Sequence, residues 1–204
     1  MLLIDYIKDN FTENTPFSPS EIKIKQMSDD AIKMELSRLY KKGALKKVSR
    51  GLYYIPGSDK SLPSSIDLIE KSYIGSGDNV FGFYMGPLYI KSILGQRPLE
   101  SDHICIMSNK MSSGKRDIYR FKKKISLRKP YFTIEKSNVE INGFLTYLAT
   151  ASYEDIQTNF PILSNYIRAN HLSANDVIKL TPYFPSKMTS KLLSSDLYRS
   201  LWKH

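Results

Sequence analysis

Two helix-start signals lie close together near the beginning of the chain and strongly limit how this part can fold. Ser18 is followed by Pro19, which suits the first position of a helix, and Glu21 completes a capping box. Ser28 is followed by two aspartates, whose charges suit the positive end of a helix dipole. Helices that begin so near each other are short and closely connected. The sequence therefore predicts a small helical module here.

Apolar residues at helical spacing supply the inner faces of this module. Leu3, Ile7 and Phe11 predict a short amphipathic helix at the start of the chain. The helix that begins after Ser28 is expected to end at Gly43, because glycine readily takes the positive φ of a helix stop. Its expected buried stripe is Ile32, Leu36 and Leu39.

Two short strand-like runs follow these helices, over residues 45–48 and 52–55. Ser49-Arg50-Gly51 joins them, with glycine suited to a tight turn. Three helices followed by a basic hairpin form the layout of a winged helix-turn-helix. In that fold the third helix enters the major groove of DNA. Residues 1–57 are thus expected to form a winged helix-turn-helix DNA-binding domain.

The charge of this module supports a nucleic-acid partner. The chain carries a formal net charge of +10, and no acidic residue lies between Glu35 and Asp59. Lys33 and Ser37 lie one turn apart near the start of the third helix, so we expect them to contact bases or lie close to them. A winged fold that contacts only protein is the alternative. The residues expected to hold the DNA backbone are Arg38, Lys41, Lys46, Lys47 and Arg50.

One string of residues resembles a known family. Leu36-Ser-Arg-Leu39, Lys42-Gly43 and Val48-Ser-Arg-Gly-Leu-Tyr-Tyr-Ile-Pro56 resemble the N-terminal winged domain of AbiEi-type antitoxins, which are transcriptional regulators of type IV toxin–antitoxin and abortive-infection systems. The resemblance implies an autorepressor that binds inverted repeats in its own promoter. It also implies an antitoxin that counters a nucleotidyltransferase toxin without forming a stable complex with it.

The rest of the chain mixes strands and helices, so the expected fold class is α+β. Residues 57–64 are rich in Gly, Ser and Pro and form the expected linker, followed by a C-terminal α/β domain within residues 58–204. Strands are predicted over 80–84 and 103–107, a short helix over 87–94, and a helical end from Gly143 onward. This order of elements also resembles the C-terminal region of the AbiEi-type family.

A second basic window precedes the helical end. Between Asp102 and Glu135 the only acidic residue is Asp117. Alternation predicts one amphipathic strand over residues 119–128, with four cations along ~25 Å of its outer face. We expect this basic patch to engage RNA, nucleotide or an acidic protein; a charged edge that resists aggregation is the alternative. The four cations are Arg120, Lys122, Lys124 and Arg128.

Few residues point to catalysis or to a metal. The single cysteine, Cys105, lies in an apolar run and is expected to be buried, and the three histidines lack metal-binding spacing. Gly75-Ser76 could begin a nucleotidyltransferase motif, but no acid lies between Asn79 and Gln96. The spacing of Asp102, Asp117 and Glu135 gives no reason for these acids to converge as a nuclease site. We therefore predict no enzyme, no cofactor and no metal.

No apolar run is long enough to cross a membrane, and the opening residues do not resemble a signal peptide. We therefore expect a cytoplasmic protein with no membrane partner. The leading hypothesis is an AbiEi-type antitoxin that represses its own promoter. The alternative is a stand-alone winged-helix regulator whose C-terminal domain dimerises or binds a ligand.

Overall fold

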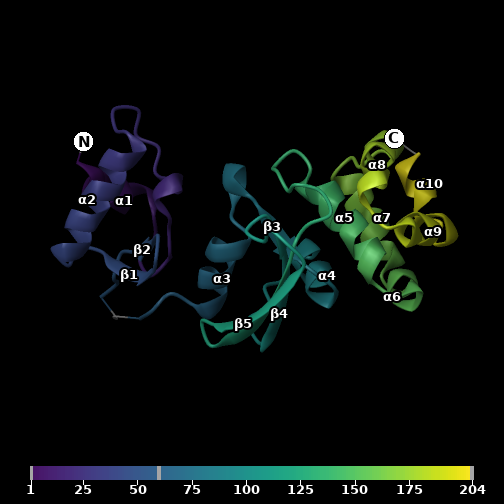
Figure 1. The fold of residues 1–204 in the computed structure, drawn as a ribbon, viewed down its shortest axis with the longest axis horizontal. Coiled ribbons are helices and arrows are strands. Elements are labelled where there is room, and N and C mark those ends of the chain that lie inside the picture. The colour runs from purple at the N-terminus through teal and green to yellow at the C-terminus, as the bar shows by residue number, and fades with distance from the viewer. Residues whose placement is uncertain (1, 59–60, 203–204) are drawn as a thin grey trace. The chain divides into compact units, whose positions relative to one another are not determined.

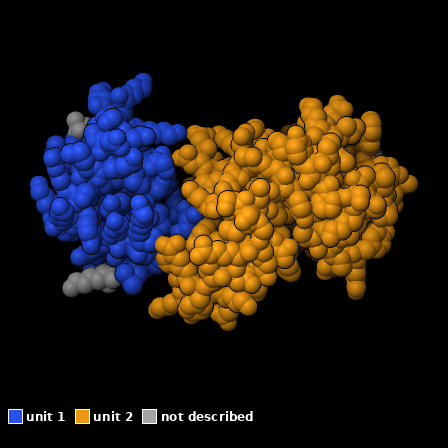
Figure 2. All heavy atoms as spheres, viewed as in Figure 1, with its two compact units in different colours: residues 1–72 blue, residues 73–204 orange. Residues whose placement is uncertain are grey.

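The computed structural model describes residues 2–58 and 61–202, and its fold is α+β as predicted (Figure 1). The chain divides into two compact units, residues 1–72 and residues 73–204 (Figure 2). This boundary lies later than the expected division after residue 57. One reason is that Lys71 forms an ion pair with Glu21. Lys71 lies in the helix Ser65–Tyr73, so this ion pair holds that helix to the first unit. Residues 59–60 of the expected linker, and His204, lie outside the described residues.

The first unit contains two α-helices, a short 3₁₀ turn, a hairpin and most of a third α-helix. Phe17, Leu36 and Leu45 are fully buried in its core, and Leu3 and Ile7 pack there from the first helix. The elements are α1 (Leu3–Asn10), η1 (Pro19–Glu21), α2 (Asp29–Lys41), β1 (Lys46–Ser49), β2 (Leu52–Tyr54) and α3 (Ser65–Tyr73).

The prediction of an α-helix after Ser18 is wrong, because the chain forms only the 3₁₀ turn η1 there. The start signal itself is present: the Ser18 backbone N–H donates to Glu21 Oε2 at 2.8 Å. The helix stops at Ile22, whose backbone is extended. From Ile22 onward, apolar and lysine side chains alternate, which is a strand-like period that a helix cannot bury on one face.

The helix α2 agrees with the prediction. Ser28 Oγ accepts a hydrogen bond from the Ala31 backbone N–H at 3.2 Å, so the N-terminal cap is confirmed. The predicted stripe of Ile32, Leu36 and Leu39 is buried. Gly43 follows the helix with φ +77°, as expected of a helix stop.

The predicted hairpin is also present. Strands β1 and β2 pair antiparallel, with Lys47 opposite Tyr53 and Gly51 at φ +76° in the turn. Tyr53 also exchanges two backbone hydrogen bonds with Phe17, at 2.8 and 3.0 Å. This bridge fixes the hairpin to the segment between α1 and η1.

A four-stranded mixed sheet forms the first half of the second unit. Its order is β3-β4-β6-β5, with β4 parallel to β6 and the other neighbours antiparallel. The predicted strands near residues 80–84 and 103–107 and the short helix between them are all present. The elements are η2 (Gly77–Asn79), β3 (Gly82–Tyr84), α4 (Pro87–Ile93), β4 (His103–Ser108), β5 (Lys115–Arg120) and β6 (Lys123–Arg128).

The second half of this unit is helical, as predicted, and Figure 1 shows these helices gathered into one bundle. Its core is centred on α5, where Phe144, Leu145 and Leu148 are fully buried. Ser173 caps α8 by accepting from the Asp176 backbone N–H at 3.2 Å. The elements are α5 (Val139–Thr150), α6 (Tyr153–Thr158), α7 (Phe160–Ala169), α8 (Ala174–Leu180), η3 (Thr181–Tyr183), α9 (Ser186–Ser194) and α10 (Tyr198–Leu201).

Gly143, in the middle of α5, packs directly against the ring of Tyr89 in α4. A Cβ at position 143 would lie 2.8 Å from Cε2 of that ring. Alanine normally stabilises a helix interior by ~1 kcal/mol relative to glycine. We nevertheless expect Gly143→Ala to lower the free energy of unfolding by about 1–3 kcal/mol, because the ring must move in a packed core. Urea denaturation followed by circular dichroism measures the change.

A double variant provides the control for this prediction. Tyr89→Leu removes the ring, so adding Gly143→Ala to it should cost little or even stabilise the helix. A single variant Gly143→Ala at least as stable as the wild type would show that the close contact does not constrain this position.

Candidate nucleic-acid interface

The solvent face of α2 carries the predicted base-contacting residues. Lys33 is exposed and Ser37 is half-buried, on the side of the helix away from the buried stripe. Lys33 Nζ lies 3.0 Å from Asp30 Oδ1. Arg38, on the same exposed side, has its Nη1 3.1 Å from Glu35 Oε2. Lys33 and Arg38, two of the side chains predicted to contact DNA, are therefore paired with carboxylates of their own helix.

These two ion pairs are weak enough to exchange. The Lys33 and Asp30 side chains are 60% and 88% exposed, so water screens the attraction between them. The hydrogen bond that Lys33 donates to Asp30 raises the pKa of the Lys33 ammonium above its ordinary value, so the lysine stays charged. A phosphate or a base edge can therefore replace Asp30 as its partner at small cost.

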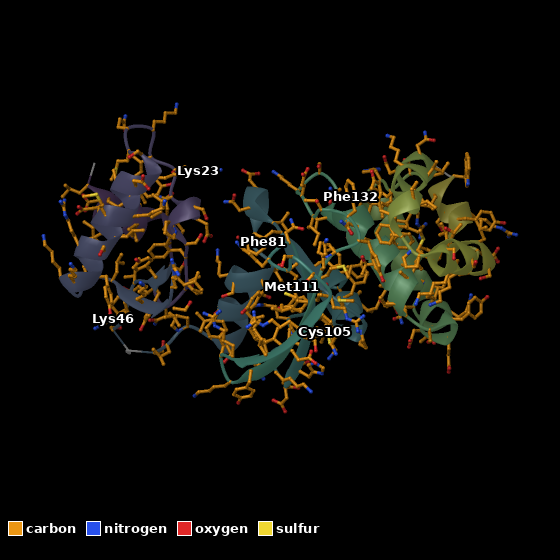
Figure 3. The ribbon with its side chains drawn as sticks, viewed as in Figure 1. Lys23, Lys46, Phe81, Cys105, Met111 and Phe132 are labelled. Carbon is orange, nitrogen blue, oxygen red and sulfur yellow. The ribbon has the colours of Figure 1, made fainter. Side chains whose placement is uncertain are left out.

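The hairpin supplies cations that do not pair with any residue in the described part of the chain. Lys46, Lys47 and Arg50 are exposed and form no ion pair with another described residue, as is also true of Lys41 at the end of α2. Figure 3 labels Lys46 on this hairpin. The Lys47 ammonium lies 5.7 Å from the centre of the Tyr53 ring. Their exposure is compatible with the phosphate contacts predicted for them, which stay a prediction.

Two exposed side chains of α2 were missed by the sequence reasoning. Met34 is 60% exposed and Tyr40 is 45% exposed, although both are large and partly apolar. Met34 lies between the predicted DNA-contacting residues on the solvent face. It precedes Ser37 by three residues and Lys41 by seven, and this helical spacing could have revealed its exposure. An apolar group among donors suits a DNA-reading surface, because thymine presents a methyl group in the major groove.

The predicted single basic strand over residues 119–128 is wrong. The chain turns back at Phe121 and Lys122, whose φ angles are +53° and +60°, so β5 and β6 form a hairpin. A two-residue loop with both φ angles positive is the turn that suits the twist of a hairpin. The alternation of charges continues through the turn, which is why the sequence resembled one strand.

The hairpin separates the four predicted cations. All four are exposed, but residues paired across two strands point to the same face of the sheet. Lys124 pairs with Tyr119, and Arg128 pairs with Lys115. Both cations therefore lie on the same face of the sheet. Arg120 lies on the opposite face, where its Nη1 donates to the Tyr73 hydroxyl at 3.2 Å. Lys122 lies in the turn itself, so the expected row of cations does not exist.

A polar cluster that the sequence reasoning missed lies on the face of Lys124 and Arg128. Ser126 Oγ donates to Asp117 Oδ1 at 2.5 Å, and lies 2.8 Å from His103 Nε2. Cys105 Sγ lies 3.8 Å from the same histidine nitrogen. Period-two spacing within β4 could have shown that His103 and Cys105 share a face of that strand. Only the pairing of β4 with β6 brings them to Ser126.

This cluster is not arranged to activate the thiol. Because Ser126 donates to Asp117, its oxygen accepts from His103, and the histidine Nε2 then carries a proton. That nitrogen cannot also take the thiol proton. Cys105, labelled in Figure 3, is half-buried rather than buried as expected, and packs against a core cluster that includes Met107. The hydrogen bonds from Ser126 and Lys115 lower the pKa of Asp117 below its ordinary value, so it is ionised at neutral pH.

The three acids considered for a nuclease site have separate roles. Asp102 lies 3.5 Å from Lys123 Nζ, Asp117 belongs to the polar cluster, and the Glu135 backbone N–H donates to Asn138. Among the described residues, no three His, Cys, Asp or Glu side chains are placed to hold a metal ion. No described helix is both long and apolar enough to cross a membrane.

Comparison with protein-family models and with curated proteins gives no significant match to either.

Proposed function

We propose that the chain is a DNA-binding transcriptional regulator that acts through its first unit. The observation that carries the proposal is the placement of exposed cations on α2 and on the adjoining hairpin of one compact unit. Duplex DNA needs cations for its phosphates and short donors for its base edges, and these two elements provide both. The proposal places the chain in the cytoplasm with its DNA and assigns it no catalytic step.

The dimensions of α2 fit this role. Its 13 residues give a helix ~20 Å long and about 10–12 Å across with side chains, which matches the width of the major groove. The hairpin follows after the Gly43 stop, so its turn residue Arg50 reaches toward the flanking phosphates. In this arrangement α2 takes the part of the recognition helix, and β1–β2 the part of the wing, in a winged helix-turn-helix whose middle helix is reduced to η1.

A gel shift tests the proposal. Purified chain is titrated onto the DNA upstream of its own coding sequence and onto a scrambled duplex of equal length, at about 150 mM salt, where non-specific binding is weak. Binding to the upstream DNA at least tenfold tighter than to the scrambled duplex is expected. Equal or absent binding would overturn the assignment of a specific DNA regulator.

The antitoxin role is a narrower proposal, supported by the resemblance of the α2–hairpin string to AbiEi-type antitoxins. It states that the second unit counters a nucleotidyltransferase toxin without a stable complex. Co-expression with a nucleotidyltransferase encoded beside it should restore growth, and pull-down should recover no complex. Growth arrest that persists despite full expression of the chain would contradict this role.

A second candidate, a stand-alone regulator with a ligand-binding second unit, is supported by a cavity in that unit. The cavity has a volume of about 680 Å³ and is lined by residues of β3, α4, α5 and α7. This volume lies within the usual range for small-molecule sites.

A further inference from the structure

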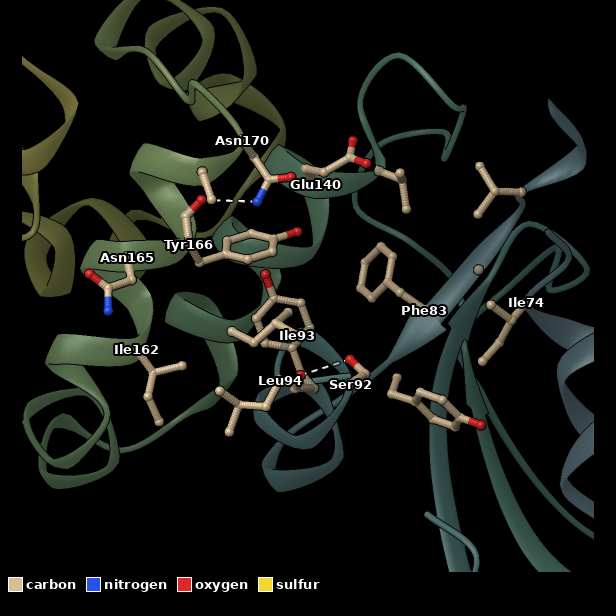
Figure 4. Close-up of a pocket in the computed structure, with 16 residues that line it drawn as sticks. Ile74, Phe83, Ser92, Ile93, Leu94, Glu140, Ile162, Asn165, Tyr166 and Asn170 are labelled. Atoms are coloured by element: carbon tan, nitrogen blue, oxygen red, sulfur yellow. Dashed lines mark hydrogen bonds between the residues drawn. The ribbon is translucent and has the colours of Figure 1, made fainter. Parts of the chain in front are cut away.

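The cavity of the second unit has an aromatic wall to which Tyr89, Tyr166 and Phe83 contribute. The Tyr89 ring stacks on Tyr147, with ring centres 5.5 Å apart, and meets Tyr166 edge-on at 6.1 Å. Tyr89 and Tyr166 line the cavity together with Phe83 of β3 (Figure 4). Aromatic faces carry negative charge density, so they attract apolar groups and cations alike.

One polar atom in this wall lacks a partner. Tyr89 is 4% exposed, and its buried hydroxyl forms no hydrogen bond within the described structure. The Tyr166 side chain lies nearby, and its interaction with Tyr89 adds to burial in raising the pKa of Tyr89. A buried hydroxyl without a partner is uncommon in folded proteins. This hydroxyl oxygen is itself buried, so the cavity meets the Tyr89 ring and not its hydroxyl.

Both tyrosine hydroxyls of the wall are neutral. Burial raises the pKa of Tyr89 well above its ordinary value, and burial raises the pKa of Tyr166 to about 12. A neutral phenol can either donate or accept a hydrogen bond, so these groups do not repel a ligand of either charge.

The charge of the cavity comes from a single residue. Glu140, in the first turn of α5, is the only charged residue among the described residues that line it. Glu140 is half-buried and forms no ion pair with another described residue. Its carboxylate acts on both Tyr89 and Tyr166, raising their pKa values further. In a chain with a net charge of +10, this site is locally negative.

We propose that this cavity binds a small primary amine with an aromatic or bulky apolar body. The ammonium group would be held by the Glu140 carboxylate, beside the aromatic wall. The apolar body would lie against Phe83, Ile93 and Ile162, which face the same space in Figure 4. Positive charge on the ligand is favoured by both the carboxylate and the aromatic faces.

Three probes of equal size separate charge from shape. Isothermal titration calorimetry of the full chain at pH 7 compares 2-phenylethylamine, 2-phenylethanol and phenylacetate. We expect the amine to bind at least tenfold tighter than the alcohol, and the carboxylate to bind most weakly. Equal affinities for amine and alcohol, tighter binding of phenylacetate, or no heat from the amine at millimolar concentration would each overturn the proposal.

Matched variants locate the site. Glu140→Gln should weaken binding of the amine at least tenfold and leave binding of the alcohol unchanged, whereas Glu135→Gln, which removes an exposed acid outside the cavity, should change neither. Tyr89→Phe removes a hydroxyl that the cavity does not reach and should leave binding of the amine within about twofold of the wild type. A loss of amine binding as large in Glu135→Gln as in Glu140→Gln would place the site elsewhere. No DNA is present, so the result is independent of the gel shift.

Discussion

Replacing Lys46 and Lys47 together by alanine is expected to weaken binding to upstream and scrambled DNA alike, by roughly tenfold at 150 mM salt. Both side chains are exposed on β1 and carry no ion pair with a described residue, so each is available to a phosphate. Each lost phosphate contact should also reduce the slope of log affinity against log salt by ~0.9. Gel shifts at several salt concentrations measure both effects.

The corresponding pair on α2 should behave differently. Lys33→Ala with Ser37→Ala should weaken binding to the upstream DNA by about tenfold or more, because a good base contact contributes about 1–3 kcal/mol of discrimination. Binding to scrambled DNA should change much less. Equal losses on both duplexes would contradict the assignment of α2 as the recognition helix.

A control with the same change of net charge completes this comparison. Lys179 and Lys187 are exposed in the second unit, so Lys179→Ala with Lys187→Ala removes two positive charges without touching α2 or the hairpin. This pair should leave both affinities within about twofold of the wild type. A loss equal to that of the Lys46 and Lys47 variant would mean that overall charge, and not the hairpin, determines binding.

Gly82→Ala is expected to prevent stable folding of the second unit. A Cβ at position 82 would lie 2.1 Å from the Tyr73 carbonyl oxygen and 2.8 Å from that of Met107. Both atoms belong to the backbone and cannot rotate away, as a side chain could. A cost above ~4 kcal/mol follows, because strand β3 must move away from β4 or from the end of α3. Thermal unfolding followed by circular dichroism measures the loss.

Gly77→Ala provides the control for this variant. Gly77 lies a few residues earlier, and no atom lies within 4 Å of the position of its added Cβ. Its φ of +54° makes alanine cost only about 1–2 kcal/mol. A Gly82→Ala protein as stable as the Gly77→Ala protein would show that β3 has room for a side chain.

The parts of the fold that local signals determine could be predicted from the sequence. The Ser28 cap, the buried stripe of α2 and the Gly51 turn each depend on residues within a few positions of one another. The reduced η1 shows the limit of such signals, because its capping box is present but the residues after it cannot bury a helical face.

The polar cluster and the cavity depend on distant pairing, which local patterns do not contain. His103 and Ser126 meet only because β4 and β6 pair in parallel, and the turn at Phe121 uses positive φ without glycine. The cavity needs β3, α4, α5 and α7 together, and in the sequence Tyr89 is simply one more aromatic residue in a short helix. The surface that we propose for DNA could be predicted in part, since exposed charges on a helix follow from its period, whereas the exposure of Met34 went unnoticed.

The strand order β3-β4-β6-β5 also has a consequence for the synthesis of the chain. The apolar strand β4 leaves the ribosome roughly twenty residues before β6, its parallel partner. One edge of β4 therefore stays unpaired for about one to four seconds. During that interval the Ile104-Cys-Ile-Met107 segment presents unpaired backbone groups beside apolar side chains, which other chains can join. The β5–β6 hairpin forms within microseconds once it is complete and can then close this edge as one piece. The rate of translation through residues 109–128 therefore sets how long each new molecule is exposed to aggregation.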